Sequence, residues 1–233
     1  MVSPQASDVI PSLRTQTDMT IREERLEITK GSWIFDLRGD EKAVSLFIGQ
    51  RPFSYWWSVQ EETKIDYLVR LTSKKPNFRD NSYHVSTENG SDNLVPLSEI
   101  LAPVLPYFAS GTYQACLEDL DAGYDIKDIW DASTSIVKAK PYYGGVMSFM
   151  LTQPRQALSE ERILYYRQKI RAKHYPIVFS ISIAEHHDRY VLDGHHKLEA
   201  YRRTGVYARS LNLIRQEPLR VHSRVRGLHQ KKG

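Results

Sequence analysis

Residues 190–205, YVLDGHHKLEAYRRTG, constrain the fold more than any other part of this chain. A stretch typical of a strand ends at Asp193-Gly194, and a helical pattern begins at once with His195 and His196. Glycine permits a tight turn and a close backbone approach, and the first amides of a helix have no partner within the helix. The helix dipole adds partial positive charge at that end, so the segment predicts an anion-binding site, with phosphate as the preferred anion.

The polar residues of this turn are the candidate site residues. His195, His196 and Lys197 are placed to neutralise phosphate charge beside the helix end, and Gly194 leaves room for the anion. Asp193 is the nearest carboxylate for the base or metal ligand that phosphoryl transfer needs. A structural role for Asp193 as a side-chain cap of the helix is an equal alternative.

The rest of the C-terminal third alternates between strands and helices. A helix is predicted over LSEERILYYRQKIRAK, with Ser159 as N-cap and Glu160 and Glu161 in its first turn. Strands are predicted at VMSFMLTQ, YPIVFSISI and SLNLIRQ, and Gly205 is predicted to end the last helix.

Three motifs occur here in a characteristic order: Gln153-Pro154-Arg155 before the helix, Pro176-Ile177-Val178 after it, and then Asp193 to Lys197. In that order they resemble the ParB/sulfiredoxin superfamily, the fold of the ParB N-terminal domain, over residues 146–216. The resemblance implies a small mixed α/β domain whose strand–glycine–helix element holds nucleotide phosphates.

The phosphate-binding role that the resemblance implies falls on Gly194, His195, His196 and Lys197, with Arg155 as a further partner. The Asp-Gly-His-His-Lys form is closer to members that resemble free-serine kinases. The resemblance therefore implies ATP or ADP rather than CTP, with Mg²⁺, and a small-molecule acceptor.

The catalytic candidates of such a phosphotransferase or nucleotide hydrolase are Asp193, His196 and Glu160. His195 stands where sulfiredoxin has its reactive cysteine, so sulfinic-acid repair is not expected. The alternatives are a non-catalytic nucleotide sensor or interaction protein, and a ParB-like nucleic-acid-binding protein or nuclease. For Glu160, a first-turn acid that favours any helix, the structural role is the stronger one.

Residues 24–140 predict a strand-rich module of unknown role, so the expected fold class is α+β. Runs rich in β-branched and aromatic residues predict an antiparallel meander of about four strands over residues 24–73. Two helices are expected over residues 96–133, the second from the helical spacing of Leu117, Leu120 and Tyr124. Residues 1–23 are expected to be a disordered lead-in, and residues 217–233 a basic tail.

Charge separates the two expected modules. Residues 1–152 contain 15 Lys/Arg and 21 Asp/Glu, whereas residues 153–233 contain 17 and 7. This asymmetry favours an anionic ligand for the second module, although docking of the acidic half on the basic half is an equal alternative.

The sequence shows neither a membrane-spanning run nor a signal peptide, and its single cysteine cannot form an internal disulfide, so a cytoplasmic protein that contacts no membrane is expected. Five of the eight histidines lie between His174 and His196. Adjacent helical histidines point about 100° apart, so no metal site is predicted from them.

Overall fold

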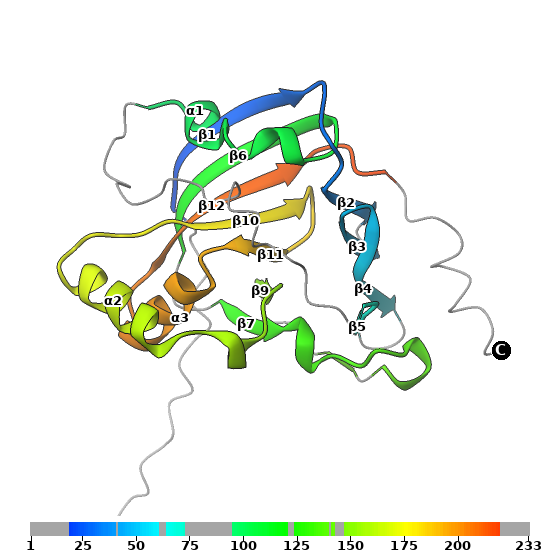
Figure 1. Cartoon of the computed structure of the whole chain (residues 1–233). Coiled ribbons are helices and arrows are strands. Elements are labelled where there is room, and N and C mark those ends of the chain that lie inside the picture. The colour runs from blue at the N-terminus through cyan, green and yellow to red at the C-terminus, as the bar shows by residue number, and fades with distance from the viewer. Residues whose placement is uncertain are drawn as a thin grey trace, which may run out of the picture.

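The computed structural model describes residues 19–40, 42–60, 64–72, 95–120, 124–139, 141–142 and 147–219. Over these residues the chain is a strand-rich α+β protein in which two sheets pack against each other (Figure 1). The seven-stranded sheet has the order β1 (Met19–Ile28), β6 (Gly111–Leu120), β12 (Ala208–Arg215), β10 (Val178–Ile183), β11 (Asp188–Asp193), β9 (Ser148–Leu151) and β7 (Asp125–Asp128).

The second sheet is an antiparallel meander extended by one short strand. Its order is β2 (Phe35–Asp40), β3 (Ala43–Ile48), β4 (Arg51–Gln60), β5 (Lys64–Arg70) and β8 (Pro141–Tyr142). Strands β2 to β5 confirm the meander predicted from the aromatic and β-branched runs.

The larger sheet is mixed. Antiparallel pairs join β1 with β6, β6 with β12, and β10 with β11, whereas β12 with β10, β11 with β9, and β9 with β7 are parallel. The helices are α1 (Leu97–Leu101), α2 (Glu160–Arg171) and α3 (His195–Thr204), with short 3-10 turns η1 (Leu105–Tyr107), η2 (Ile129–Asp131), η3 (Ile136–Lys138) and η4 (Arg155–Ala157). No helix in the described part of the chain has the length and apolar character needed to cross a bilayer.

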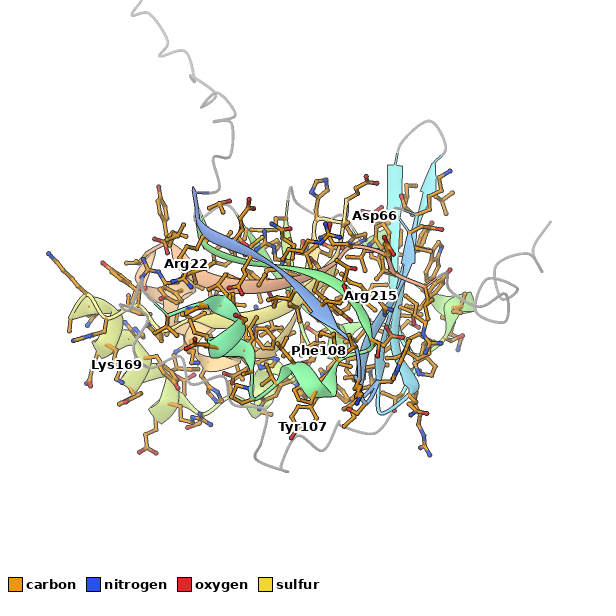
Figure 2. All side chains as sticks on the ribbon, turned by 90° about the horizontal axis from the view of Figure 1, so that it is seen from above. Arg22, Asp66, Tyr107, Phe108, Lys169 and Arg215 are labelled. Carbon is orange, nitrogen blue, oxygen red and sulfur yellow. The ribbon has the colours of Figure 1, made fainter. Side chains whose placement is uncertain are left out.

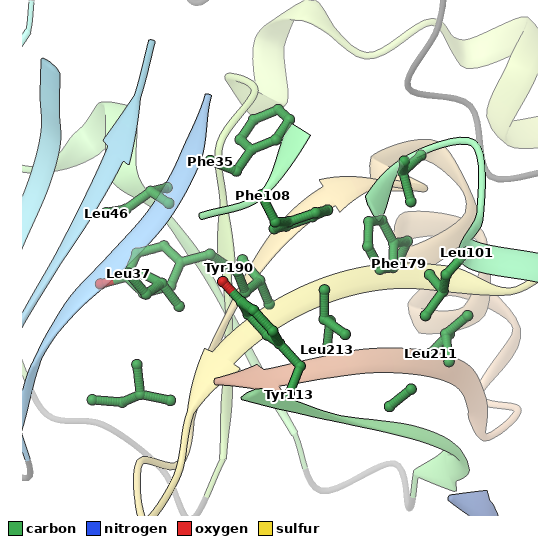
Figure 3. Packing of buried hydrophobic residues seen from close by; sticks show 14 of the residues in the cluster. Phe35, Leu37, Leu46, Leu101, Phe108, Tyr113, Phe179, Tyr190, Leu211 and Leu213 are labelled. Carbon is green, nitrogen blue, oxygen red and sulfur yellow. The ribbon is translucent and has the colours of Figure 1, made fainter. Parts of the chain in front are cut away.

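Two apolar cores cover the two faces of the larger sheet. The first lies between the sheets, where Leu37 and Leu46 of the smaller sheet meet Tyr113, Phe179 and neighbouring residues of the larger one (Figure 3). The second lies between the opposite face and helices α2 and α3, and is built from the buried residues Phe149, Val178, Val191, Ile163, Tyr166, Leu198 and Tyr201. The start of α3 is therefore fixed by burial as well as by backbone hydrogen bonding.

The C-terminal elements confirm the sequence predictions. Ser159 is the N-cap of α2, where its hydroxyl accepts a hydrogen bond from the Arg162 amide at 3.4 Å. Gly205 ends α3 in the left-handed conformation with φ +66°. Strands β9, β10, β11 and β12 lie at the predicted runs.

The second helix expected within residues 96–133 is wrong, because residues 111–120 form β6. Tyr113, Ala115 and Leu117 alternate toward the core between the sheets. Leu120 belongs to the second core, on the opposite face of the sheet, so apolar residues on both faces of β6 imitate helical spacing.

The expected division into residues 24–140 and 146–216 is also corrected. Strands β1, β6 and β7 come from the first segment and pair in one sheet with β9 to β12 from the second. Residues 19–23 of the expected lead-in belong to β1, while residues 1–18 lie outside the described residues. Of the expected basic tail, Leu219 accepts a hydrogen bond from the Gly39 amide at 2.8 Å, and residues 220–233 lie outside the described residues.

Candidate functional site

Helix α3 begins directly after β11, at Gly194. This residue has φ +96°, in the left-handed region that favours glycine. A Cβ atom added there would lie 3.1 Å from the Val178 Cα and 3.3 Å from the Lys197 Cδ. The turn therefore requires glycine both for its backbone conformation and for its close approach to β10.

The amino end of α3 differs from that of α2. Among the described residues no side chain caps α3, and its first turn contains no acidic residue. Helix α2, in contrast, has the Ser159 cap together with Glu160 and Glu161 in its first turn. Within the described part of the chain, the start of α3 thus has neither a side-chain cap nor an acid within its first turn, and the Asp193 carboxylate directly before Gly194 is the negative charge that acts on it.

His195 faces the interior and is 5% exposed. Its Nε2 accepts a hydrogen bond from the Gln153 amide at 3.2 Å, and the Thr152 hydroxyl lies 3.2 Å from the same atom. Burial lowers the pKa of His195 to about 4, so the imidazole is neutral at pH 7. His195 therefore holds the Gln153 strand end in place and contributes no charge to an anion.

His196 also accepts a hydrogen bond from a backbone amide of the segment that follows β9. Its Nε2 accepts a hydrogen bond from the Ser159 amide at 3.0 Å. Burial, with a smaller contribution from the positive charge of Arg162, lowers the pKa of His196 to about 4. The two neutral imidazoles together fasten residues 153–159, the segment containing the Gln-Pro-Arg motif, against the first turn of α3.

Lys197 is directed into the protein. Its ammonium donates to the Ile177 carbonyl at 3.1 Å and to the Asp193 carboxylate at 3.3 Å, and only 6% of the residue is exposed. Asp193 keeps more contact with solvent, with 22% of its side chain exposed. The structure thus brings Asp193, Gly194, His196 and Lys197 together, but it turns the two basic side chains toward protein partners.

Glu160 lies away from Asp193, at the last turn of α3. Its carboxylate accepts two hydrogen bonds from Arg203, at 2.6 and 2.7 Å, and these lower the pKa of Glu160. Arg203 also donates to Glu199 at 2.7 Å. Glu160 is therefore part of an ion-pair network that joins α2 to α3.

Arg155 lies in η4, and its side chain lines a cavity beside the carboxyl end of α3. The backbone amide of Arg155 donates to the Asp128 carboxylate at 2.8 Å. The Asp128 carboxylate also accepts a hydrogen bond from the Trp130 amide. Burial raises the pKa of Asp128. Asp128 and Thr152 position the Gln-Pro-Arg segment, yet no local sequence signal marks them, because their partners lie 27 and 39 or more residues away.

No group of three or more His, Cys, Asp or Glu side chains in the described ranges is arranged to hold a metal ion. No family model, curated protein or solved structure matches the chain. The class defined by the fold is a mixed α+β protein with a strand–glycine–helix turn at Gly194.

Proposed function

We propose that this protein binds the phosphates of a nucleotide, ATP or ADP with Mg²⁺, at the amino end of α3. The observation that carries this proposal is the uncapped, acid-free first turn after Gly194, which contrasts with the capped and acidic first turn of α2. Backbone amides directed at an anion, with the helix dipole behind them, are sufficient for phosphate binding without a charged side chain.

Two further features support a bound phosphate here. Residues 153–159 are held against the helix end by the imidazoles of His195 and His196, which gives the turn a second wall of fixed geometry. Arg162 lies close enough to His196 for its charge to lower the imidazole pKa, so one cation accompanies the helix end. Mg²⁺ would enter with the nucleotide, coordinated mainly by the phosphate oxygens.

As an enzyme, the protein would transfer a phosphoryl group to a small-molecule hydroxyl or to water. In this proposal the helix amides stabilise the phosphate charge, and Asp193 accepts the proton of the attacking hydroxyl. The ion pair with Lys197 orients that carboxylate. His196, whose Nε2 already accepts the Ser159 amide, acts as a positioning residue.

A non-catalytic nucleotide sensor is the second candidate, and one observation favours it. The three residues selected as catalytic each have a protein partner: Asp193 has Lys197, His196 has the Ser159 amide, and Glu160 has Arg203. A site built only for binding would tolerate these contacts, whereas catalysis would require Asp193 to be shared between Lys197 and substrate.

The test is calorimetric titration and thermal unfolding with ATP, ADP, CTP and GTP, with and without Mg²⁺. Nucleotide at a hundredfold excess over its Kd is expected to stabilise the fold by about 2.7 kcal/mol, or about 5–10 °C. His196→Glu places a carboxylate beside the phosphates and is expected to weaken binding roughly tenfold or more. Gln168→Glu, which adds the same charge on the exposed side of α2, is the matched control.

The two candidates are separated by measuring release or transfer of the γ-phosphate by the protein that binds. Turnover that Asp193→Asn abolishes supports the enzyme, and binding without turnover supports the sensor. If no nucleotide binds the wild-type protein, or if His196→Glu and Gln168→Glu bind equally, the phosphate site is refuted.

A further inference from the structure

A cavity of about 270 Å³ lies beside the carboxyl end of α3, at the opposite end of the helix from Gly194. The two helix ends are roughly 16 Å apart, from the rise of about 1.5 Å per residue. The walls of the cavity come from the start of β7, from η4, and from the last turn of α3. The nucleotide-phosphate proposal uses the segment 153–159, which contains Arg155, but gives the Arg155 side chain no role, so the two sites can be tested separately.

The cavity has an apolar wall and a charged rim. Tyr124, Ile126 and Val206 supply the wall, and Arg155 and Arg202 supply guanidinium groups. The Tyr124 ring packs edge-on against Phe149, with centroids 5.2 Å apart, so the wall is fixed by the second core. Such a mixture of a flat apolar surface with a few polar groups is typical of small-molecule sites.

The ion pairs around the rim leave Arg155 without an ion-pair partner among the residues that the structure describes. Arg202 is paired with Glu199 at 2.5 Å, and Asp125 of the lining is paired with Lys127 at 2.5 Å. Arg203 and Glu160 complete the neighbouring network with equal numbers of both signs. Arg155 forms no ion pair within the described ranges, and its exposed side chain faces the cavity.

The acidic groups near the cavity offset this charge only in part. Asp128 accepts a hydrogen bond from the backbone amide of Arg155, and its carboxylate also attracts the Arg155 guanidinium without forming an ion pair with it in the described part of the chain. Glu199 is 4% exposed and accepts hydrogen bonds from both Arg202 and Arg203. Burial raises the pKa of the Tyr124 phenol, which stays neutral. An anion entering the cavity would therefore meet Arg155 and the outer edge of Arg202, whose side chain is 51% exposed.

We propose that this cavity binds a small organic anion, an oxyanion group on a flat apolar body, with the oxyanion paired to Arg155 and the body against Tyr124, Ile126 and Val206. A carboxylate and a phosphate monoester share this chemistry. The forked guanidinium of Arg155 can donate two parallel hydrogen bonds to either group. The volume, near the lower end for ligand sites, suits a small metabolite.

The test uses benzoate, phenyl phosphate and the neutral analogue benzamide as probes, with binding followed by two-dimensional NMR of the full chain. We expect benzoate or phenyl phosphate to shift the amide signals of residues 124–126 and 205–206, and benzamide to bind at least tenfold more weakly. Arg155→Gln should weaken binding of the anion by roughly tenfold to a hundredfold and leave benzamide unchanged. Arg155→Lys keeps the positive charge but loses the forked guanidinium, so its affinity for the anion should lie between those of the wild type and Arg155→Gln.

Arg171→Gln is the matched control, because Arg171 is an exposed arginine of α2 outside the cavity lining. The side chain of Arg155 is exposed, so its replacement is compatible with folding, which thermal unfolding will verify. Preference for benzoate identifies a carboxylate ligand, and preference for phenyl phosphate a phosphate monoester. The proposal is overturned if Arg155→Gln and Arg171→Gln bind the anions with the same affinity, or if benzamide binds the wild-type protein as tightly as both anions do. Loss of nucleotide binding in His196→Glu, with these probes unaffected, would separate this site from the phosphate site.

Discussion

Replacement of Asp36 by asparagine tests the contact that joins the two sheets. Asp36 of β2 is fully buried, and its carboxylate accepts hydrogen bonds from Arg215 of β12 and, at 2.6 Å, from Arg38. Arg215 is 2% exposed and lies where the larger sheet meets the smaller one (Figure 2). Its other hydrogen bonds go to the carbonyl groups of Leu37 and Ser110, at 3.2 and 3.4 Å.

The expected cost follows from the charge that remains. Asp36→Asn preserves the side-chain volume but leaves the Arg215 guanidinium buried without a counterion, which costs about 3–5 kcal/mol. Arg38 can turn toward water because 22% of its side chain is exposed, so it adds little to this cost. The remaining amide oxygen of asparagine can still accept one hydrogen bond, which places the expected loss near 3 kcal/mol. Such a loss is a large share of a total stability of about 5–15 kcal/mol.

The assay is equilibrium unfolding in urea, extrapolated linearly to water. Asp119→Asn is the matched control: Asp119 pairs with Arg209 at 2.8 and 2.9 Å, but the two side chains are 25% and 20% exposed. Solvent screening limits that loss to about 1 kcal/mol. The combined change Asp36→Leu with Arg215→Met should destabilise less than Asp36→Asn, because no charge is left unpaired. Equal losses for Asp36→Asn and Asp119→Asn would refute the reasoning.

Two further predictions concern the turn that begins α3. The folded-state pKa of His195, about 4, is below the ordinary value of 6.5, so its contribution to stability is present above pH 6.5 and is lost as the pH falls toward 4, by about 2 kcal/mol at pH 5. Urea midpoints at pH 7 and pH 5 should therefore differ less in His195→Gln than in the wild type, and an unchanged difference would contradict this. Gly194→Ala should cost about 1–3 kcal/mol more than Gly205→Ala, because both residues have positive φ but only Gly194 has backbone within 3.1 Å of the added Cβ. Thermal unfolding compares the stabilities of the two variants, and equal losses of stability would contradict the prediction, because the close approach to Val178 would then add nothing to the loss.

The strands and helices of the C-terminal third could be predicted from the sequence because their signals are local. Ser159 followed by Glu160 and Glu161 marks the start of α2, and Gly205 marks the end of α3, within one turn of chain in each case. Strand β6 could not be predicted in this way. Its identity depends on pairing with β1 and β12, whose residues lie about 90 positions away on either side, for example Glu23 and Asn212 opposite Cys116. Local periodicity carries no information about such partners.

The same limit applies to the division of the chain. The change of charge along the chain favoured two modules, yet β7 and β9 pair across the expected boundary in parallel register from Asp125↔Ser148 to Asp128↔Leu151. The acidic carboxylates of the first half, Glu118 and Asp119, pair with Arg189 and Arg209 of the second half. The opposite charges of the two halves thus partly reflect ion pairs within one fold, the alternative left open by the sequence.

The candidate site shows which part of a functional pattern a sequence can specify. Asp-Gly followed by a helical pattern predicted a tight turn from strand to helix, and the geometry of Gly194 agrees, because that geometry is set by adjacent residues. The charge of the site was not predictable, because it depends on what each imidazole contacts. His195 and His196 are residue types that suit a phosphate site. Their Nε2 atoms, however, accept hydrogen bonds from backbone amides about 40 positions earlier in the chain, and burial keeps both rings neutral. An anion at this turn would therefore bind to backbone dipoles, with weaker dependence on pH between 6 and 8 than a site of protonated histidines would show.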